Sequence, residues 1–163
     1  MSSPAVDLRC FSKGFTNSFS ESSGEIPEWQ RWNDYGIGLL LKGKAELKQA
    51  SEAFVQVEAL GRFDGPLNLA RVQFAEGDLD GATQSLRRAA EMDPPPPSWT
   101  HGWLSGIVNR QQGNFEAAAD SLRAVLQTKV PERGFDFSLD YVVRNALGLT
   151  LVDLAQRAEV LDI

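Results

Sequence analysis

The sequence predicts an all-α protein in which three helical hairpins and a final helix stack into a short solenoid. Three stretches repeat one pattern, and they start at Gly43, Gly77 and Gly113, 34 and 36 residues apart. In each stretch an alanine lies a few residues after the glycine, and a large apolar residue lies four positions after that alanine. A period near 34 residues is typical of stacked helical hairpins. One such hairpin cannot bury its own apolar face, so its neighbours must cover that face.

The composition is that of a globular chain with an acidic balance. Of the 163 residues, 42 % are hydrophobic and 23 % charged, and the formal net charge is −6. Nucleic-acid binding needs a basic stripe, so this balance argues against nucleic acid as a partner. The longest apolar run, residues 37–41, is far shorter than the roughly 18 residues of a membrane span. Cys10 is the only cysteine, which excludes an internal disulfide, a cysteine zinc cluster and a covalent haem site within this chain.

Two regions follow from the pattern along the chain. Residues 1–26 form a Ser- and Phe-rich arm without a sustained period, and we expect this arm to be mostly irregular. Phe11, Phe15 and Phe19 lie four apart in it, so they share a face if the arm turns helical. Residues 27–163 form the repeat domain.

The helices of the repeat domain are delimited by glycine and proline. Pro27 suits the first turn of a helix that ends at Gly43, and the partner helix ends at Gly61. The second hairpin runs from Asp64 to the prolines after Asp93 and turns at Gly77. The third runs from Ser98 to Pro131 and turns at Gly113. A final amphipathic segment, 137–163, is either the first helix of a fourth unit or a capping helix. Its polar outer face is expected from Arg144, Asp153, Gln156, Arg157 and Glu159.

The second helix of each hairpin carries a small–large–small pattern, and this pattern resembles the tetratricopeptide repeat family. The three triplets are Ala50…Phe54…Val57, Ala82…Leu86…Ala89 and Ala118…Leu122…Val125. The first helices match less well, with Trp32, Gly36, Ala70, Gly106 and Gly148 at the motif positions. The first turn is two residues longer than the pattern. The resemblance covers about residues 28–160 and implies a right-handed superhelical stack.

The resemblance also implies that a protein or peptide ligand binds along the concave surface formed by the first helices. The side chains expected to line that groove are Asn33, Ile37, Asn68, Arg71, Phe74, Trp103, Ile107, Arg110 and Asn145. Arg71 and Arg110 would be cations in an acidic protein, which favours an acidic or carboxylate-bearing segment as the ligand. The alternative is that these arginines pair with Glu76, Asp78 or Glu116 on the surface.

No motif points to catalysis, so we expect a non-catalytic binding scaffold without cofactor or metal. His101 is the only histidine and has no second ligand at helical spacing, which favours a structural role. Two alternatives stay open. One is a self-association module that forms a homo-oligomer through Phe135, Phe137, Tyr141 and the arm. The other is an accessory domain of a larger redox protein, because the run from Trp32 is also similar to repeat regions of bacterial multihaem cytochromes. The expected compartment is the cytoplasm, or the periplasm in the cytochrome case.

Overall fold

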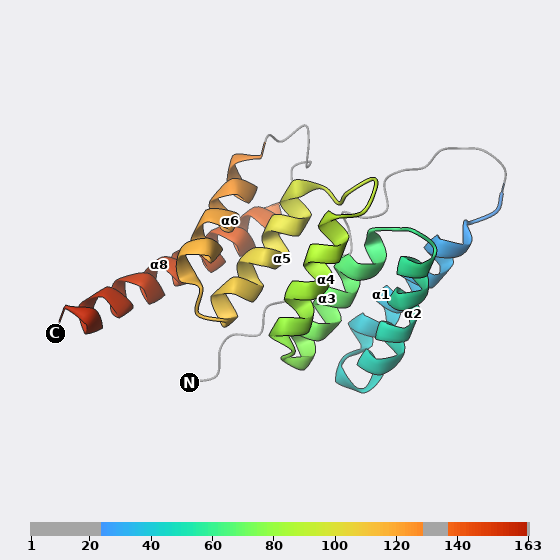
Figure 1. Cartoon of the computed structure of the whole chain (residues 1–163), viewed down its shortest axis with the longest axis horizontal. Helices are drawn as coiled ribbons and strands as arrows, with labels where there is room; N and C mark the ends of the chain where they lie inside the picture. The colour runs from blue at the N-terminus through green and yellow to red at the C-terminus, as the bar shows by residue number, and fades with distance from the viewer. Residues whose placement is uncertain (1–23, 129–136, 163) are drawn as a thin grey trace.

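The computed structural model describes residues 24–128 and 137–162, and these residues form helices and no strand. In chain order the helices are α1 (Glu28–Lys42), the 3-10 turn η2 (Lys44–Glu46), α2 (Leu47–Ala59), α3 (Asp64–Glu76), α4 (Leu79–Ala90), α5 (Ser98–Gln111), α6 (Phe115–Gln127) and α8 (Phe137–Leu161). The hairpins are α1–α2, α3–α4 and α5–α6, and α8 packs on the third (Figure 1). The predicted all-α stack of hairpins is confirmed. The boundary between the arm and the repeat domain stays a prediction, because nearly all of the arm lies outside the described residues.

The turns inside the hairpins explain both the repeat and its one irregularity. Gly77 directly follows α3, and Gly113 lies in the turn after α5. Their φ angles of 83° and 81° lie in the left-handed region, which favours glycine. Gly43 instead has φ 111° and is followed by η2 before α2 begins. The two extra residues in the first turn are therefore taken up by a single 3-10 turn.

The large residues of the repeat triplets pack against glycines of the first helices. A Cβ atom placed on Gly36 of α1 would lie 2.6 Å from the Phe54 ring, and one on Gly106 would lie 2.7 Å from Leu122. Phe54 and Leu122 are fully buried, so neither side chain can move out to make room. Small residues in the first helices therefore allow the second helices to approach closely.

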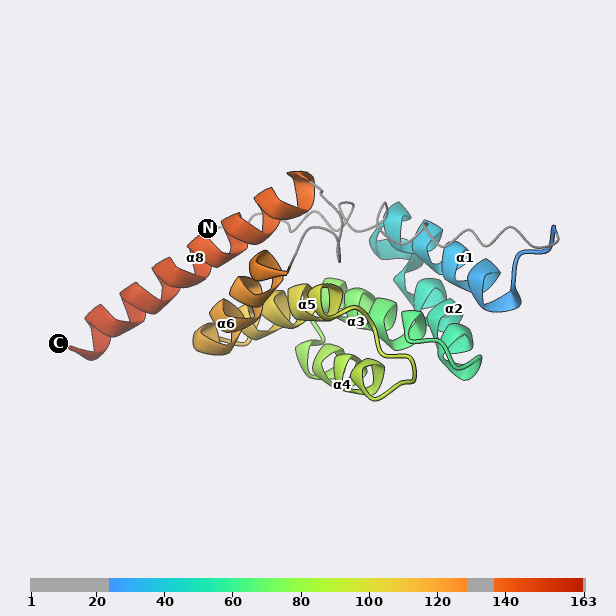
Figure 2. The same ribbon diagram turned by 90° about the horizontal axis from the view of Figure 1, so that it is seen from above.

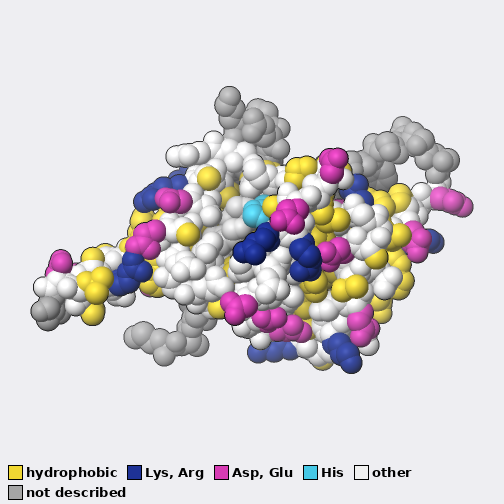
Figure 3. Space-filling view, viewed as in Figure 1, with side chains coloured by type: hydrophobic (Ala, Val, Ile, Leu, Met, Phe, Trp, Pro, Cys, Tyr) yellow, Lys and Arg dark blue, Asp and Glu magenta, His cyan; other side chains and the backbone are white. Residues whose placement is uncertain are grey.

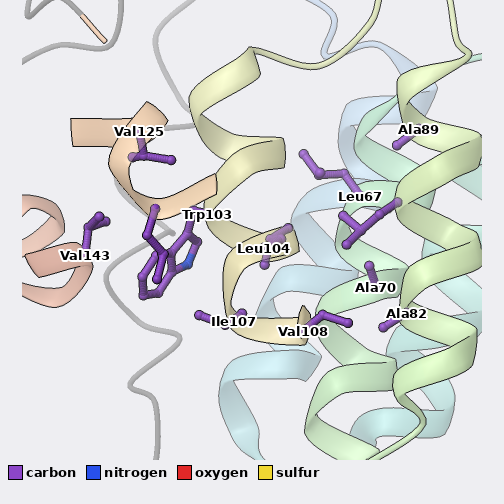
Figure 4. Close-up of a cluster of buried hydrophobic side chains, with 12 residues drawn as sticks. Leu67, Ala70, Ala82, Ala89, Trp103, Leu104, Ile107, Val108, Val125 and Val143 are labelled. Carbon is purple, nitrogen blue, oxygen red and sulfur yellow. The ribbon is translucent and has the colours of Figure 1, made fainter. Parts of the chain in front are cut away.

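The buried apolar side chains form two clusters that share α3. One cluster joins α1, α2 and α3 through residues such as Phe54 and Val72. The other joins α3, α4, α5, α6 and α8, with Leu67 of α3 at one side and Val143 of α8 at the other (Figure 4). Because α3 contributes to both clusters, every residue from 64 to 72 is buried. α3 thus couples the first hairpin to the rest of the stack.

Candidate ligand-binding face

The first helices of successive hairpins lie next to one another, as a tetratricopeptide-like arrangement requires. α1 contacts α3, and α3 contacts α5, while α2 and α4 lie on the other side of the stack (Figure 2). The residues expected to line a groove are carried by α1, α3, α5 and α8, so the stack places them along one layer of helices.

Three of the expected residues form a buried polar row that crosses from α1 to α3. The Asn68 side-chain amide donates a hydrogen bond of 2.9 Å to Oδ1 of Asn33. Nη1 of Arg71 donates a hydrogen bond of 3.1 Å to Oδ1 of Asn68. The three side chains are only 0–5 % exposed, so sequence reasoning identified their neighbourhood but not their depth. We call Asn33, Asn68 and Arg71 the polar row.

The polar row contains a cation in a place of low solvent access. Burial lowers the pKa of the Arg71 guanidinium to about 10, because desolvation disfavours the charged form. A pKa near 10 still leaves the group charged at neutral pH. The row therefore holds a positive charge beneath the layer of first helices, with amide groups on one side of it.

Trp103 and Ile107 lie deeper than the sequence analysis expected. Both belong to the larger apolar cluster, at 1 % and 4 % exposure, and Trp103 lies on the side of α5 that faces Val143 of α8 (Figure 4). The expectation that these two side chains line an open groove is thereby corrected. Their depth follows from α8, which covers this side of α5 and turns a predicted surface into core.

The other four expected residues are less buried than the polar row. Ile37 and Phe74 are half-buried, each packed against one apolar cluster. Arg110 of α5 forms an ion pair of 3.1 Å with Asp153 of α8. Asn145 is exposed on α8. The nine residues therefore do not converge on one pocket, and their ligand-binding role stays a prediction.

The alternative that arginines pair with surface carboxylates holds for Arg110, but with a partner that the sequence did not indicate. Its partner is Asp153, 43 residues away, whereas Glu116 forms an ion pair with Arg157. Asp153 and Arg157 were expected on a polar outer face of α8, and the structure instead turns them toward α5 and α6. Arg71 donates a hydrogen bond to Asn68 of the same helix.

His101 has a structural position between two helices. Its Nε2 lies 2.9 Å from the carbonyl oxygen of Leu86 in α4, and its Nδ1 lies 3.3 Å from the Ser105 hydroxyl. These contacts tie α5 to α4. No cluster of three or more His, Cys, Asp or Glu side chains suited to a metal ion occurs among residues 24–128 and 137–162.

An exposed aromatic pair on α1 was not predicted as a surface. Trp32 and Tyr35 are 37 % and 52 % exposed and contact edge to face, with ring centroids 6.3 Å apart. Together with Glu28 and Arg31 they line a shallow depression. Trp32 stands at a motif position of the repeat, and its spacing of three residues to Tyr35 was the available signal for a shared face.

Charges of both signs are interspersed over the face shown in Figure 3, where the single histidine lies near arginine or lysine and acidic side chains. This face carries no extended basic patch of the kind that nucleic acids require. None of the helices in the described part of the chain is long and apolar enough to span a membrane.

Comparison with known proteins gives one family match. Residues 67–133, which contain most of the second hairpin and the whole of the third, match the tetratricopeptide repeat family model. No curated protein matches the chain. The similarity to repeat regions of bacterial multihaem cytochromes stays a prediction. Tetratricopeptide repeats are protein–protein interaction modules and typically lack catalytic activity. The matched segment, the hairpin geometry and the small–large packing together identify residues 67–133 as tetratricopeptide repeats.

Proposed function

We propose that this protein is a non-catalytic scaffold that binds a protein or peptide segment along its layer of first helices. The polar row Asn33–Asn68–Arg71 is the observation that carries this proposal, because it places a guanidinium and amide groups across α1 and α3. Guanidinium and amide N–H groups are donors, so they favour carboxylate and carbonyl oxygens. The segment they suit is acidic or ends in a carboxylate.

Arg71 carries its charge among apolar neighbours of the same helix. Burying a guanidinium is costly, and well-packed apolar side chains in its place are often as stabilising or more so. Neighbouring buried positions of α3, such as Leu69 and Val72, are indeed apolar. The proposal assigns the charge at position 71 to recognition of the ligand.

The depth of the polar row sets the expected mode of binding. Because Arg71 is only 1 % exposed, a ligand reaches it by displacing the side chains that cover it. Association that depends on such a rearrangement is slower than docking onto an open surface.

A peptide selection with matched arginine variants tests the proposal. Displayed random peptides are selected on the native protein, and the enriched peptides are titrated against Arg71→Met and Arg88→Met. Arg88 lies on α4 and is paired with Glu58, so its variant removes the same charge from the second-helix side. We expect peptides rich in carboxylates, a loss of affinity of about tenfold or more with Arg71→Met, and none with Arg88→Met.

Stability measured on the same variants separates recognition from folding. Arg71→Met removes the donor to Oδ1 of the buried Asn68, so it is expected to lower the free energy of unfolding by about 1–3 kcal/mol, and the peptide titrations are made at a temperature where both variants stay folded. A selection without enrichment, or equal losses with both variants, would contradict the proposal.

A further inference from the structure

The last helix, α8, has one side that is fastened to the stack. Val143 and Thr150 are buried on this side. Asp153 pairs with Arg110 of α5, and Arg157 pairs with Glu116 of α6. Helix α8 is therefore held by apolar burial and by two ion pairs along the face that meets α5 and α6.

The opposite side of α8 is apolar and open. Tyr141, Leu151 and Val152 are 73 %, 40 % and 52 % exposed. Together with Arg144, Gly148, Ala155 and Glu159 they share one face of the helix, because steps of three or four residues connect them except between the adjacent Leu151 and Val152 at its centre. We call these seven residues the open face. Arg144 and Glu159 were expected on a polar outer face, whereas the exposed apolar side chains Tyr141, Leu151 and Val152 were not.

The repeat pattern shows what such a face normally contacts. Gly148 stands at the position of Gly36 and Gly106, where the second helix of each hairpin packs within 3 Å of the missing Cβ. Around Gly148 nothing lies within 4 Å. Helix α8 is thus a first helix whose packing partner is absent from the described chain.

The described chain also makes no turn that would supply this partner. Seven residues after Ala70 and Gly106 come Gly77 and Gly113, where the chain turns back. Seven residues after Gly148 comes Ala155, and α8 continues through it to Leu161. The end of the helix projects beyond α6 (Figures 1 and 2).

We propose that the open face binds the open face of a second copy of this chain, with the two α8 helices antiparallel around a two-fold axis between Leu151 and Val152. In this register Leu151 and Val152 meet at the centre. Gly148 of each copy lies opposite Ala155 of the other, and these small residues let the helices approach closely. This inference is independent of the polar row.

Charge complementarity supports a second copy rather than another partner. In the same register Arg144 of each copy lies opposite Glu159 of the other, so the two-fold axis creates two ion pairs at once. Neither Arg144 nor Glu159 forms an ion pair with any described residue, whereas Asp153 and Arg157 on the fastened side both do. Isologous pairing of this kind closes as a dimer, which is the commonest form of oligomer.

The test is the mass of the full chain by sedimentation equilibrium up to about 1 mM, where even a weak specific dimer is populated. The native protein is expected to form dimers of a 17.9 kDa chain. Arg144→Glu and Glu159→Arg each place like charges opposite one another twice, so each weakens the dimer about tenfold or more. An equimolar mixture of the two variants restores both ion pairs and is expected to recover the dimer.

Two controls keep the outcome tied to this register. Arg31→Glu makes the same charge change on exposed α1 and is expected to leave the dimer intact. Gly148→Leu is expected to weaken the dimer without lowering stability, because nothing lies near Gly148 in the single chain. A single-chain mass at all concentrations would overturn the proposal. The proposal would also be overturned if Arg144→Glu and Glu159→Arg left the dimer unchanged, or if the mixture of the two variants failed to recover the dimer.

Discussion

Two glycines of α1 provide a sharp test of the packing that defines the repeats. Gly36 and Gly38 lie two residues apart in the interior of the same helix, so replacing either with alanine gains the same helix propensity, about 1 kcal/mol. Their surroundings differ completely. A Cβ on Gly36 would lie 2.6, 2.9 and 3.0 Å from three carbons of the Phe54 ring, while a Cβ on Gly38 would meet nothing within 4 Å.

The difference between the two variants therefore isolates the contact with Phe54. The ring is 0 % exposed and cannot swing into solvent, so α1 and α2 must separate or repack, at a cost of about 1–3 kcal/mol. Gly38→Ala is expected to raise the free energy of unfolding by up to about 1 kcal/mol. Gly36→Ala is expected to be about 1–3 kcal/mol less stable than Gly38→Ala, which separates their melting temperatures by about 2–12 °C.

Urea and thermal unfolding followed by circular dichroism measure this difference. Both substitutions lie in one helix, so any departure from a two-state transition affects them alike. Equal stabilities, or a Gly36→Ala variant that is more stable than Gly38→Ala, would refute the close approach of α1 and α2 and with it the register of the first hairpin.

Three further predictions concern the core, an ion pair and a buried carboxyl. Ala118→Leu should lower the free energy of unfolding by about 1–3 kcal/mol in urea unfolding, because Ala118 is 0 % exposed, while Ala117→Leu on the exposed side of α6 should change it little. Asp153→Asn should lower the free energy of unfolding by about 0.2–1 kcal/mol, because it breaks the half-buried ion pair with Arg110. Urea midpoints of the native protein and the variant, compared at low and high salt, should show that this loss shrinks at high salt. Burial raises the pKa of the Asp64 carboxyl above 3.8, against the opposing influence of Arg62. The Asp64 carboxyl therefore holds its proton more tightly in the folded state than in the unfolded state. The stability that this protonation contributes is fully present below pH 3.8 and is lost as the pH rises through the folded-state pKa. Asp64→Asn should remove this part of the pH dependence in a series of urea midpoints.

The helices and their pairing could be predicted because the responsible signals are local. The glycine turns, the proline stops and the small–large triplets each act within one hairpin, and Phe54 and Leu122 lie where the triplets placed them. The longer first turn was also visible as an irregular spacing. The sequence could not show that a 3-10 turn accommodates the two extra residues, because several turn geometries can do so.

The depth of the candidate site could not be predicted, since it depends on contacts between distant segments. The pattern places Asn68 and Trp103 on the first helices, but their burial is set by neighbours on other elements. Asn68 is bonded to Asn33, 35 residues away. Trp103 is part of the core because Val143 of α8 belongs to the same cluster. Helical periodicity assigns a face to each residue and leaves open what covers that face.

The measurement that tests the central claim most directly is the mapping of amide chemical shifts in ¹⁵N-labelled protein titrated with a peptide enriched in the selection. If the protein is a scaffold that binds through its first helices, the shifts concentrate on α1 and α3 around Asn33, Asn68 and Arg71, and they are small in α2 and α4. Shifts confined to α2 and α4, or no shifts at saturating peptide, would contradict the account.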